Sequence, residues 1–275
     1  MTALWSDPVA HAGGELLVRR APGAALICFN RPAKHNAFTD GMYAGLLALT
    51  AELAEDTAPD TGTRVVVFTG AGGRAFAAGN DIASFTAFGD DTAGADGVAY
   101  EAHVRRVLDA IAGLPQVTLA AVDGICVGGG LAVANACDLR ICSDSARFGF
   151  PIAHTLGNAL SAPLVLRCAE VWGDPVTREM LLTARLVEAD RAVALGAVTA
   201  AVAGDQLEER AWEIVERVTR AAPATIQVTK EQLRAGVQGY DAEADDARLA
   251  RAYGSTDFRG AVRAFLDKVP ARFTG

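Results

Sequence analysis

The sequence predicts an α/β fold whose C-terminal part is helical, and two observations carry this prediction. Up to about residue 150, short apolar runs rich in β-branched residues alternate with segments of helical periodicity. This alternation is typical of a largely parallel sheet covered by helices. Beyond residue 158 the apolar spacing is helical only. With 275 residues the chain is long enough to bury a full core, as one large domain or as a domain with an extension.

The elements expected in the first half follow one another closely. Residues 15–32 predict two strands around Pro22 and Gly23, because Pro-Gly between apolar runs is turn chemistry. A helix is expected from Thr39, and residues 84–97, rich in Gly, Ala and Asp, predict a mobile loop. The other expected elements are a strand at 64–70, a helix at 98–115, a strand at 116–124, a short helix to Ala136 and two short strands within 138–150.

The second half predicts helices separated by caps and breakers. Their ranges are 161–173, 177–186, 188–196, 206–222, 223–237 and 240–269.

Composition limits the class of protein. A net charge of -8 and a pI of about 5.1 argue against a nucleic-acid surface and against attraction to anionic membranes. The five cysteines lack CxxC spacing and indicate reduced core residues. The N-terminus has no basic segment followed by an apolar one, and the longest apolar run, 124–137, is too short to span a bilayer. We therefore expect a soluble, cytoplasmic protein.

Residues 70–75, "GAGGRA", match the GxGxxA pattern of a dinucleotide-binding turn. That turn should open a helix, whereas residues 74–81, "RAFAAGND", continue with small and turn-forming residues. The context favours a turn that ends a strand.

Three glycines, Gly128–Gly130, open the short helix to Ala136. Glycines at a helix entry leave approachable N–H groups, which suit a carbonyl oxygen or a developing oxyanion. Tight packing of the helix against a neighbour is the alternative. Because residues 76–81, "FAAGND", form a second small-residue turn after a strand, a cradle made of two backbone turns is plausible.

Four ordered segments resemble the crotonase, or enoyl-CoA hydratase/isomerase, superfamily, and the match begins near Leu16. They are Asn30–Phe38 "NRPAKHNAF", Ala75–Ile82 "AFAAGNDI", Ala120–Pro151 "AAVDGICVGGGLAVANACDLRICSDSARFGFP" and Phe265–Phe273 "FLDKVPARF". The resemblance implies a spiral core of ββα turns in residues 1–200. It implies a helical region in residues 201–275 that makes trimer contacts, with trimers that often pair into hexamers.

The resemblance also implies the ligand, an acyl-CoA thioester whose oxygen is held by two backbone N–H groups. Matched residue by residue, these donors fall on Ala78 and Gly129. Along the coenzyme A moiety the resemblance places Ala78, Gly79, Asn80 and Asp81, with Lys34 and Lys268 as phosphate contacts. Coenzyme A enters only as part of the substrate, and no further cofactor, nucleic acid or membrane partner is expected. No metal site is expected either, because Cys137 and Asp138 lack further ligands at suitable spacing.

Two positions depart from the hydratase pattern. Family hydratases hold and activate water with two glutamates, and here these positions are Ala132 and Ile152. Neither side chain can transfer a proton. The two-glutamate hydration route and the single-glutamate isomerase route at Ile152 are therefore in doubt.

His154, two residues after Ile152, is the substitute that we single out, since imidazole titrates near neutral pH. The alternative is a histidine that bonds the loop backbone or faces a subunit contact. Other candidates are His103, His35, Asp81 and Asn158, the last two also explained as turn caps. Phe85, Phe88 and Tyr100 are expected to line an acyl pocket or to pack in the core.

These residues predict an acyl-CoA-processing enzyme that stabilises a thioester enolate, with His154 or an ordered water transferring the proton. Two alternatives stay open. One is a different reaction on the same fold, namely thioester hydrolysis, C–C cleavage or decarboxylation. The other is an acyl-CoA-binding protein without catalysis.

Overall fold

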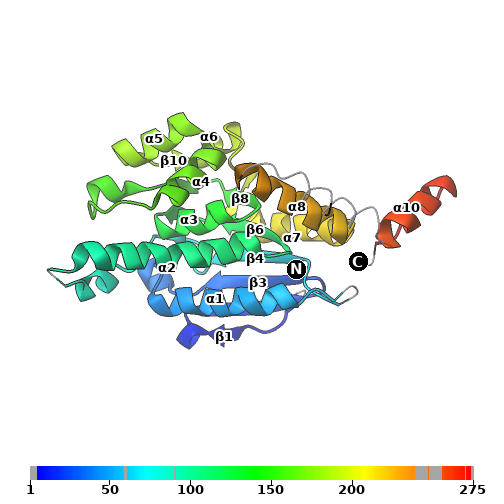
Figure 1. Ribbon diagram of the computed structural model, residues 1–275, viewed down its shortest axis with the longest axis horizontal. Helices are drawn as coiled ribbons and strands as arrows, with labels where there is room; N and C mark the ends of the chain where they lie inside the picture. Colours follow the sequence, from blue (N-terminus) through cyan, green and yellow to red (C-terminus); the bar gives the residue numbers. More distant parts are fainter. Residues whose placement is uncertain are drawn as a thin grey trace.

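Two β-sheets form the centre of the computed structural model, which describes residues 5–58, 61–89, 91–238, 247, 256–269 and 271–273 (Figure 1). The seven-stranded sheet runs β1 (Val9–His11), β2 (Leu16–Ala21), β3 (Ala24–Phe29), β4 (Val65–Gly70), β6 (Val117–Val122), β8 (Leu139–Ser143) and β11 (Ala201–Val202). The four-stranded sheet runs β10 (Val187–Glu188), β9 (Arg147–Gly149), β7 (Ile125–Val127) and β5 (Ala75–Ala77).

The prediction of a largely parallel α/β core is confirmed. From β3 to β11 every neighbouring pair of the larger sheet is parallel, and so are β5, β7 and β9 in the smaller one. Among the described strands, only the β1–β2 and β2–β3 hairpins and the β9–β10 pair are antiparallel. The β2–β3 hairpin and the strands β4, β6, β8 and β9 lie where the sequence predicts them.

The expectation of helices only beyond residue 158 is wrong, because β10 and β11 lie there. Each has two residues and extends a sheet by pairing with a strand from the first half, β9 and β8 respectively. A two-residue strand shows no alternation, so the sequence gives no signal for it. The three-residue strands β5 and β7 are absent from the sequence-based expectation for the same reason.

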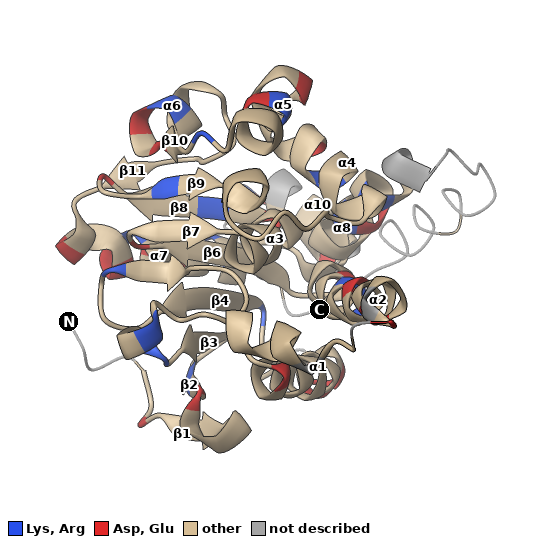
Figure 2. Cartoon of the chain, turned by 90° about the vertical axis from the view of Figure 1, so that its left-hand side faces the viewer, with Lys and Arg blue, Asp and Glu red and all other residues tan. Residues whose placement is uncertain are grey.

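Helices cover both faces of the larger sheet. On one face, α1 (Asp40–Glu55) and α2 (Ala93–Gly113) lie side by side (Figure 1), and α7 (Leu207–Thr219) covers the opposite face (Figure 2). The alternation within β4 explains this: Val66 and Phe68 enter the core that contains α1 and α2, whereas Val65 and Val67 pack with α7. The remaining helices are α3 (Gly129–Ala136), α4 (Ala162–Trp172), α5 (Asp174–Thr183), α6 (Ala189–Ala194), α8 (Pro223–Gln238) and α10 (Thr256–Leu266).

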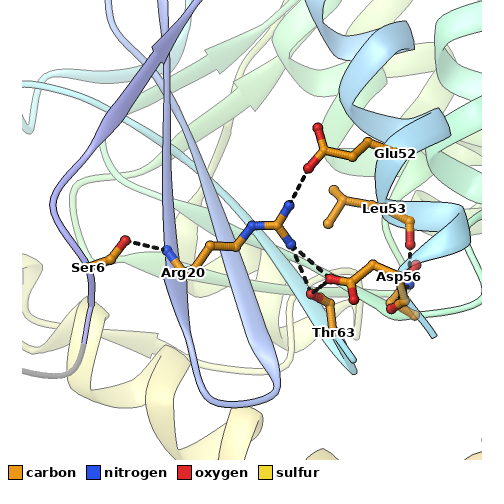
Figure 3. A network of polar contacts seen from close by, with 7 residues as sticks. Ser6, Arg20, Glu52, Leu53, Asp56 and Thr63 are labelled. Atoms are coloured by element: carbon orange, nitrogen blue, oxygen red, sulfur yellow. Dashed lines mark hydrogen bonds and ion pairs between the residues drawn. The ribbon is translucent and has the colours of Figure 1, made fainter. Parts of the chain in front are cut away.

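Two polar networks tie α1 and α8 to the larger sheet. Figure 3 shows Arg20 of β2 bonded to Glu52 at 2.7 Å, to Asp56 at 3.0 Å and to Thr63 at 3.1 Å, which ties the sheet to the last turn of α1. On α8, the Lys230 ammonium group donates to the Gln116 carbonyl and, at 2.6 Å, to the Asp138 carboxylate. Lys230 is 9% exposed, so α8 is held by a nearly buried lysine whose partner Asp138 remains partly exposed.

The loop expected at residues 84–97 is shorter in the structure. A short 3₁₀ helix, η3 (Ile82–Ala87), occupies its start, and α2 already begins at Ala93. Side-chain hydrogen bonds support both helices: Asp81 accepts from the Ala83 N–H at 3.2 Å, and Asp96 accepts from the Gly89 N–H and the Thr92 hydroxyl. The mobility of this segment stays a prediction.

The C-terminal helix expected at 240–269 lies partly outside the described residues, and α10 is its described part. In Figure 1, α10 stands apart from the two sheets. The division of the chain at residue 200 stays a prediction. Within the described ranges, no helix has the length and hydropathy needed to cross a membrane. The cytoplasmic location stays a prediction.

Candidate functional site

The two glycine turns lie side by side because β5 and β7 are parallel neighbours. Parallel strands place their carboxyl ends at the same edge of a sheet, and each turn follows directly on its strand. Gly79 follows β5 with φ +96°, and Gly128 follows β7 with φ +54°, values that favour glycine. A Cβ atom on Gly128 would stand 3.2 Å from the Gly79 Cα atom, so the backbones touch without intervening side chains.

The backbone of the first turn is fixed by the segment before α1. The Ala78 N–H donates to the His35 carbonyl at 2.9 Å. The Phe38 N–H donates to the Gly79 carbonyl, and the Asp81 N–H donates to the Phe38 carbonyl, each at 2.8 Å. The N–H of Ala78, which sequence reasoning selects as an oxyanion donor, is therefore already bonded within the chain.

Two N–H groups of these turns differ from that of Ala78. Among the described residues, neither the Asn80 N–H nor the Gly129 N–H has a hydrogen-bond acceptor. Gly129 is the first residue of α3, where the helix itself offers no acceptor. A helix N-terminus also carries a partial positive charge. Two backbone donors at adjoining turns are thus available to an oxygen atom that develops negative charge.

The side chain of Asn80 is held against Gly129. Tyr43, which is 1% exposed, donates its hydroxyl to Asn80 Oδ1 at 2.5 Å. Burial raises the pKa of Tyr43 well above its usual range, and the neighbouring Tyr100, followed by Glu101, adds to the rise, so the phenol stays a donor at neutral pH. A Cβ atom on Gly129 would stand 2.6 Å from Asn80 Oδ1 and 2.8 Å from the Tyr43 hydroxyl. A side chain at this position would therefore have to displace the Asn80 side chain.

An ion pair and a buried amide hold the chain around the first glycine turn, Ala78–Asp81, in place. Arg31 donates to Asp81 at 2.8 Å, and this hydrogen bond holds the pKa of Asp81 below its ordinary value. Asn36, fully buried, donates to the carbonyls of Ala71 and Ala75 and accepts from the Arg31 N–H. Asp81 is thus engaged in pairing and in capping η3.

A cavity of about 150 Å³ adjoins the two turns. Its lining residues are Ala78, Gly79, Asn80, Ile82, Phe85, Glu101, Val104, Val127, Gly128, Gly129, Ala132, Pro151, Ile152, Thr155, Leu156, Asn158, Leu160 and Leu164. Ala132 and Ile152 are among them, so both positions that lack a glutamate face the same space. Glu101 is the single titratable side chain among these described lining residues.

A larger pocket of about 620 Å³ adjoins the cavity and shares five lining residues with it. Phe85, Phe88 and Tyr100 line it and pack edge to face, with ring centroids 5.0 to 6.3 Å apart. The packing role expected for these three residues is therefore present among their own rings, and the binding of an acyl chain beside them stays a prediction. Their rings pack on each other and bound a mostly apolar space.

The structure separates the histidine candidates from the cavity. His154 is exposed at the end of the 3₁₀ helix η4 (Pro151–His154) and does not line the cavity, although its neighbours Ile152 and Thr155 do. His103 packs edge-on against the Tyr43 ring and bonds to Arg106. His35 is exposed and contributes its carbonyl to Ala78. The catalytic role of His154 stays a prediction.

The basic residues expected to contact phosphate lie apart from each other. Lys34 is exposed in the 3₁₀ helix η2 (Pro32–Lys34), and its charge contributes to the lowered pKa of Asp81. Lys268 is exposed after α10, which stands away from the sheets in Figure 1. Both phosphate contacts stay predictions.

Two residues of the site are absent from the sequence-based candidates. Tyr43 follows the spacing of the buried face of α1 and looks like any core aromatic residue. Glu101 does leave a signal: it precedes Val104 by three positions and Leu108 by seven, and therefore lies on the apolar stripe of α2. A carboxylate on an apolar stripe indicates a buried polar site.

The part of the chain that the structure describes contains no group of three or more His, Cys, Asp or Glu side chains placed to hold a metal ion.

Comparison with known proteins identifies the family of this chain. The model of the enoyl-CoA hydratase/isomerase family matches residues 19–275. The short-chain-enoyl-CoA hydratase of Clostridium acetobutylicum is 26% identical over 92% of this chain and 95% of its own, and enoyl-CoA delta isomerase 2 of Rattus norvegicus is 29% identical over 83% of this chain and 56% of its own. A solved enoyl-CoA hydratase/carnithine racemase from Magnetospirillum magneticum has a TM-score of 0.85, with 29% identity over 94% of this chain and 95% of that one. The chain therefore belongs to the enoyl-CoA hydratase/isomerase family, within the crotonase superfamily.

Proposed function

We propose that this chain binds an acyl-CoA thioester and stabilises the enolate that forms from it. The observation that carries the proposal is the pair of unbonded N–H groups, on Asn80 and Gly129, at two glycine turns that touch. Developing negative charge on a thioester oxygen between two fixed amides is stabilised without reorganisation of the site. Relatives named as hydratases and as an isomerase all act on enoyl-CoA according to their names, which supports the substrate class.

Asn80 takes the place that sequence reasoning gave to Ala78. The Ala78 N–H would have to leave the His35 carbonyl before it could meet a substrate, and that bond belongs to the pairing that shapes the turn. The Asn80 N–H needs no such change, and its residue is clamped by Tyr43. Gly129 keeps its proposed role. Asn80 and Gly129 are thus the proposed donors.

The acyl chain is proposed to enter the larger pocket beside Phe85, Phe88 and Tyr100. This pocket meets the cavity at Glu101 and Phe85, so a chain whose carbonyl lies between the glycine turns reaches the aromatic rings directly. The coenzyme A moiety is proposed to lie along Ala78–Asp81, with Lys34 as a phosphate contact because it is exposed and close enough to Asp81 to influence its charge. The trimer or hexamer stays a prediction.

A turnover assay with product masses tests the proposal. The panel contains short, medium and branched enoyl-CoA and 3-oxoacyl-CoA thioesters, and binding of hexanoyl-CoA is measured separately by calorimetry. We expect binding and conversion of at least one enoyl thioester. Because His154 is exposed and outside the cavity, His154→Ala is expected to keep most of the turnover. Absence of binding to every thioester would contradict the proposal.

A further inference from the structure

Glu101 is the titratable side chain among the described residues that line the cavity. The other lining residues are aliphatic, aromatic, glycine, or neutral polar side chains among the described positions. Ala132 and Ile152 cannot carry a proton, and His154 lies outside. Glu101 also lines the larger aromatic pocket, so its carboxylate stands where the two spaces meet.

One oxygen of this carboxylate is anchored and the other is not. Glu101 Oε2 accepts from the Ser161 N–H at 2.9 Å, at the residue that caps α4. Within the described residues the second oxygen has no hydrogen bond and no ion pair. A carboxylate fixed through one oxygen keeps its position while the other oxygen accepts and releases a proton.

The surroundings of Glu101 contain further polar groups without partners. The hydroxyl groups of Tyr100 and Ser161 are buried and have no hydrogen bond in the described chain, and both residues line the larger pocket with Glu101. Unpaired buried hydroxyls are uncommon in folded proteins because each costs free energy. Two unpaired hydroxyl groups beside the Glu101 carboxylate indicate a polar subsite for a ligand or for water.

We propose that Glu101 is the catalytic base and acid of this site and that it moves one proton along a 3-enoyl-CoA thioester. This inference rests on the enolate function proposed above. The C2–H bond breaks, its proton goes to Glu101, and its electron pair passes to the thioester oxygen held by Asn80 and Gly129. The dienolate then takes the same proton at C4, and the double bond moves from C3–C4 to C2–C3. One carboxylate and no co-reactant suffice.

A single acid–base group favours this proton shift over hydration. Adding water requires one group to activate the water and a proton to be delivered to the neighbouring carbon, which the family's hydratases do with two carboxylates. This cavity has one among the described residues. The site therefore suits a 1,3-proton transfer, in which the same group takes and returns the proton.

The test compares three forms of the full chain on 3-hexenoyl-CoA. The variant is Glu101→Gln, whose amide oxygen can still accept from the Ser161 N–H, and the matched control is Asp109→Asn, exposed on the same helix. Formation of the conjugated 2-enoyl thioester is followed by absorbance, and deuterium uptake at C2 and C4 in D₂O is followed by mass spectrometry. Calorimetry with hexanoyl-CoA measures binding independently.

We expect Glu101→Gln to lose about 10²- to 10⁴-fold in turnover and in deuterium uptake, while binding and the melting temperature stay close to those of the unaltered chain. Asp109→Asn is expected to match the unaltered chain. Equal turnover by Glu101→Gln would overturn the assignment and leave the enolate function standing. Binding without any isomerisation, or a product heavier by one water, would overturn the proposed reaction. No binding at all would overturn the function proposed above.

Discussion

Replacing Gly129 with alanine changes the residue that carries one of the two free N–H groups and that contacts the Asn80 side chain. The added Cβ atom would stand 2.6 Å from Asn80 Oδ1 and 2.8 Å from the Tyr43 hydroxyl, distances that real Cβ contacts do not show. The backbone on both sides is tied into β7 and α3, so the Asn80 side chain is the part that moves. Its movement breaks the hydrogen bond from Tyr43 and shifts the Asn80 N–H.

Stability and activity are expected to respond very differently. The lost Tyr43–Asn80 hydrogen bond costs about 0.5–1.5 kcal/mol of unfolding free energy. Alanine in place of glycine in a helix raises the free energy of unfolding by up to about 1 kcal/mol. The two nearly cancel, so the melting temperature should move by less than about 4 °C. Displacing one oxyanion donor costs about 2.7–4 kcal/mol of barrier, which is a 10²- to 10³-fold fall in kcat.

The assay measures kcat on the best thioester of the panel, together with thermal unfolding. Gly260→Ala is the matched control, because a Cβ atom at that position of α10 meets nothing within 4 Å. It should leave kcat unchanged. A Gly129→Ala variant with normal kcat would refute the placement of the carbonyl between the turns. A variant that fails to fold would refute the claim that the Asn80 side chain can move to make room for the added Cβ atom.

Three further predictions follow from the packing. Phe85→Ala should raise kcat/KM for bulky or long acyl chains about tenfold relative to short ones, measured by competition between two thioesters, because Phe85 borders both the cavity and the larger pocket. Lys230→Met should lower the free energy of unfolding, measured in urea, by about 3 kcal/mol. This value is the lower end of the range for breaking a buried ion pair, because the Asp138 side chain is 30% exposed and keeps two hydrogen bonds from Thr118. Asp81→Asn should lose stability at pH 6. Because Arg31 holds the pKa of Asp81 below its ordinary value, that loss should shrink as the pH falls below about 4, and a difference that grows in acid would contradict the ion pair.

The sequence predicts the long elements of this fold because each buries a regular apolar pattern. The strand β6, Val117–Val122, is buried along its whole length, and α1 begins at the cap that Thr39 predicts. The short strands β5 and β7 carry no comparable pattern. They form because they pair with each other and with β9, which is a tertiary effect.

In the candidate site, too, some features are visible in the sequence and others depend on tertiary contacts. The glycines are visible in the sequence because Gly79 and Gly128 need positive φ angles. Which N–H groups stay free is decided by partners distant in sequence: the His35 carbonyl accepts from the Ala78 N–H, whereas no described residue accepts from the Asn80 N–H. Glu101 becomes a candidate only once α2 lies beside the turns, although its place on an apolar stripe is already present in the sequence.

The most direct measurement is a crystal structure of the chain with hexanoyl-CoA. We expect a thioester oxygen about 2.7–3.1 Å from the backbone nitrogens of both Asn80 and Gly129. We also expect the Ala78 N–H to remain bonded to the His35 carbonyl. A thioester oxygen bonded to Ala78, or lying outside the space between the two glycine turns, would contradict the proposed pair of donors.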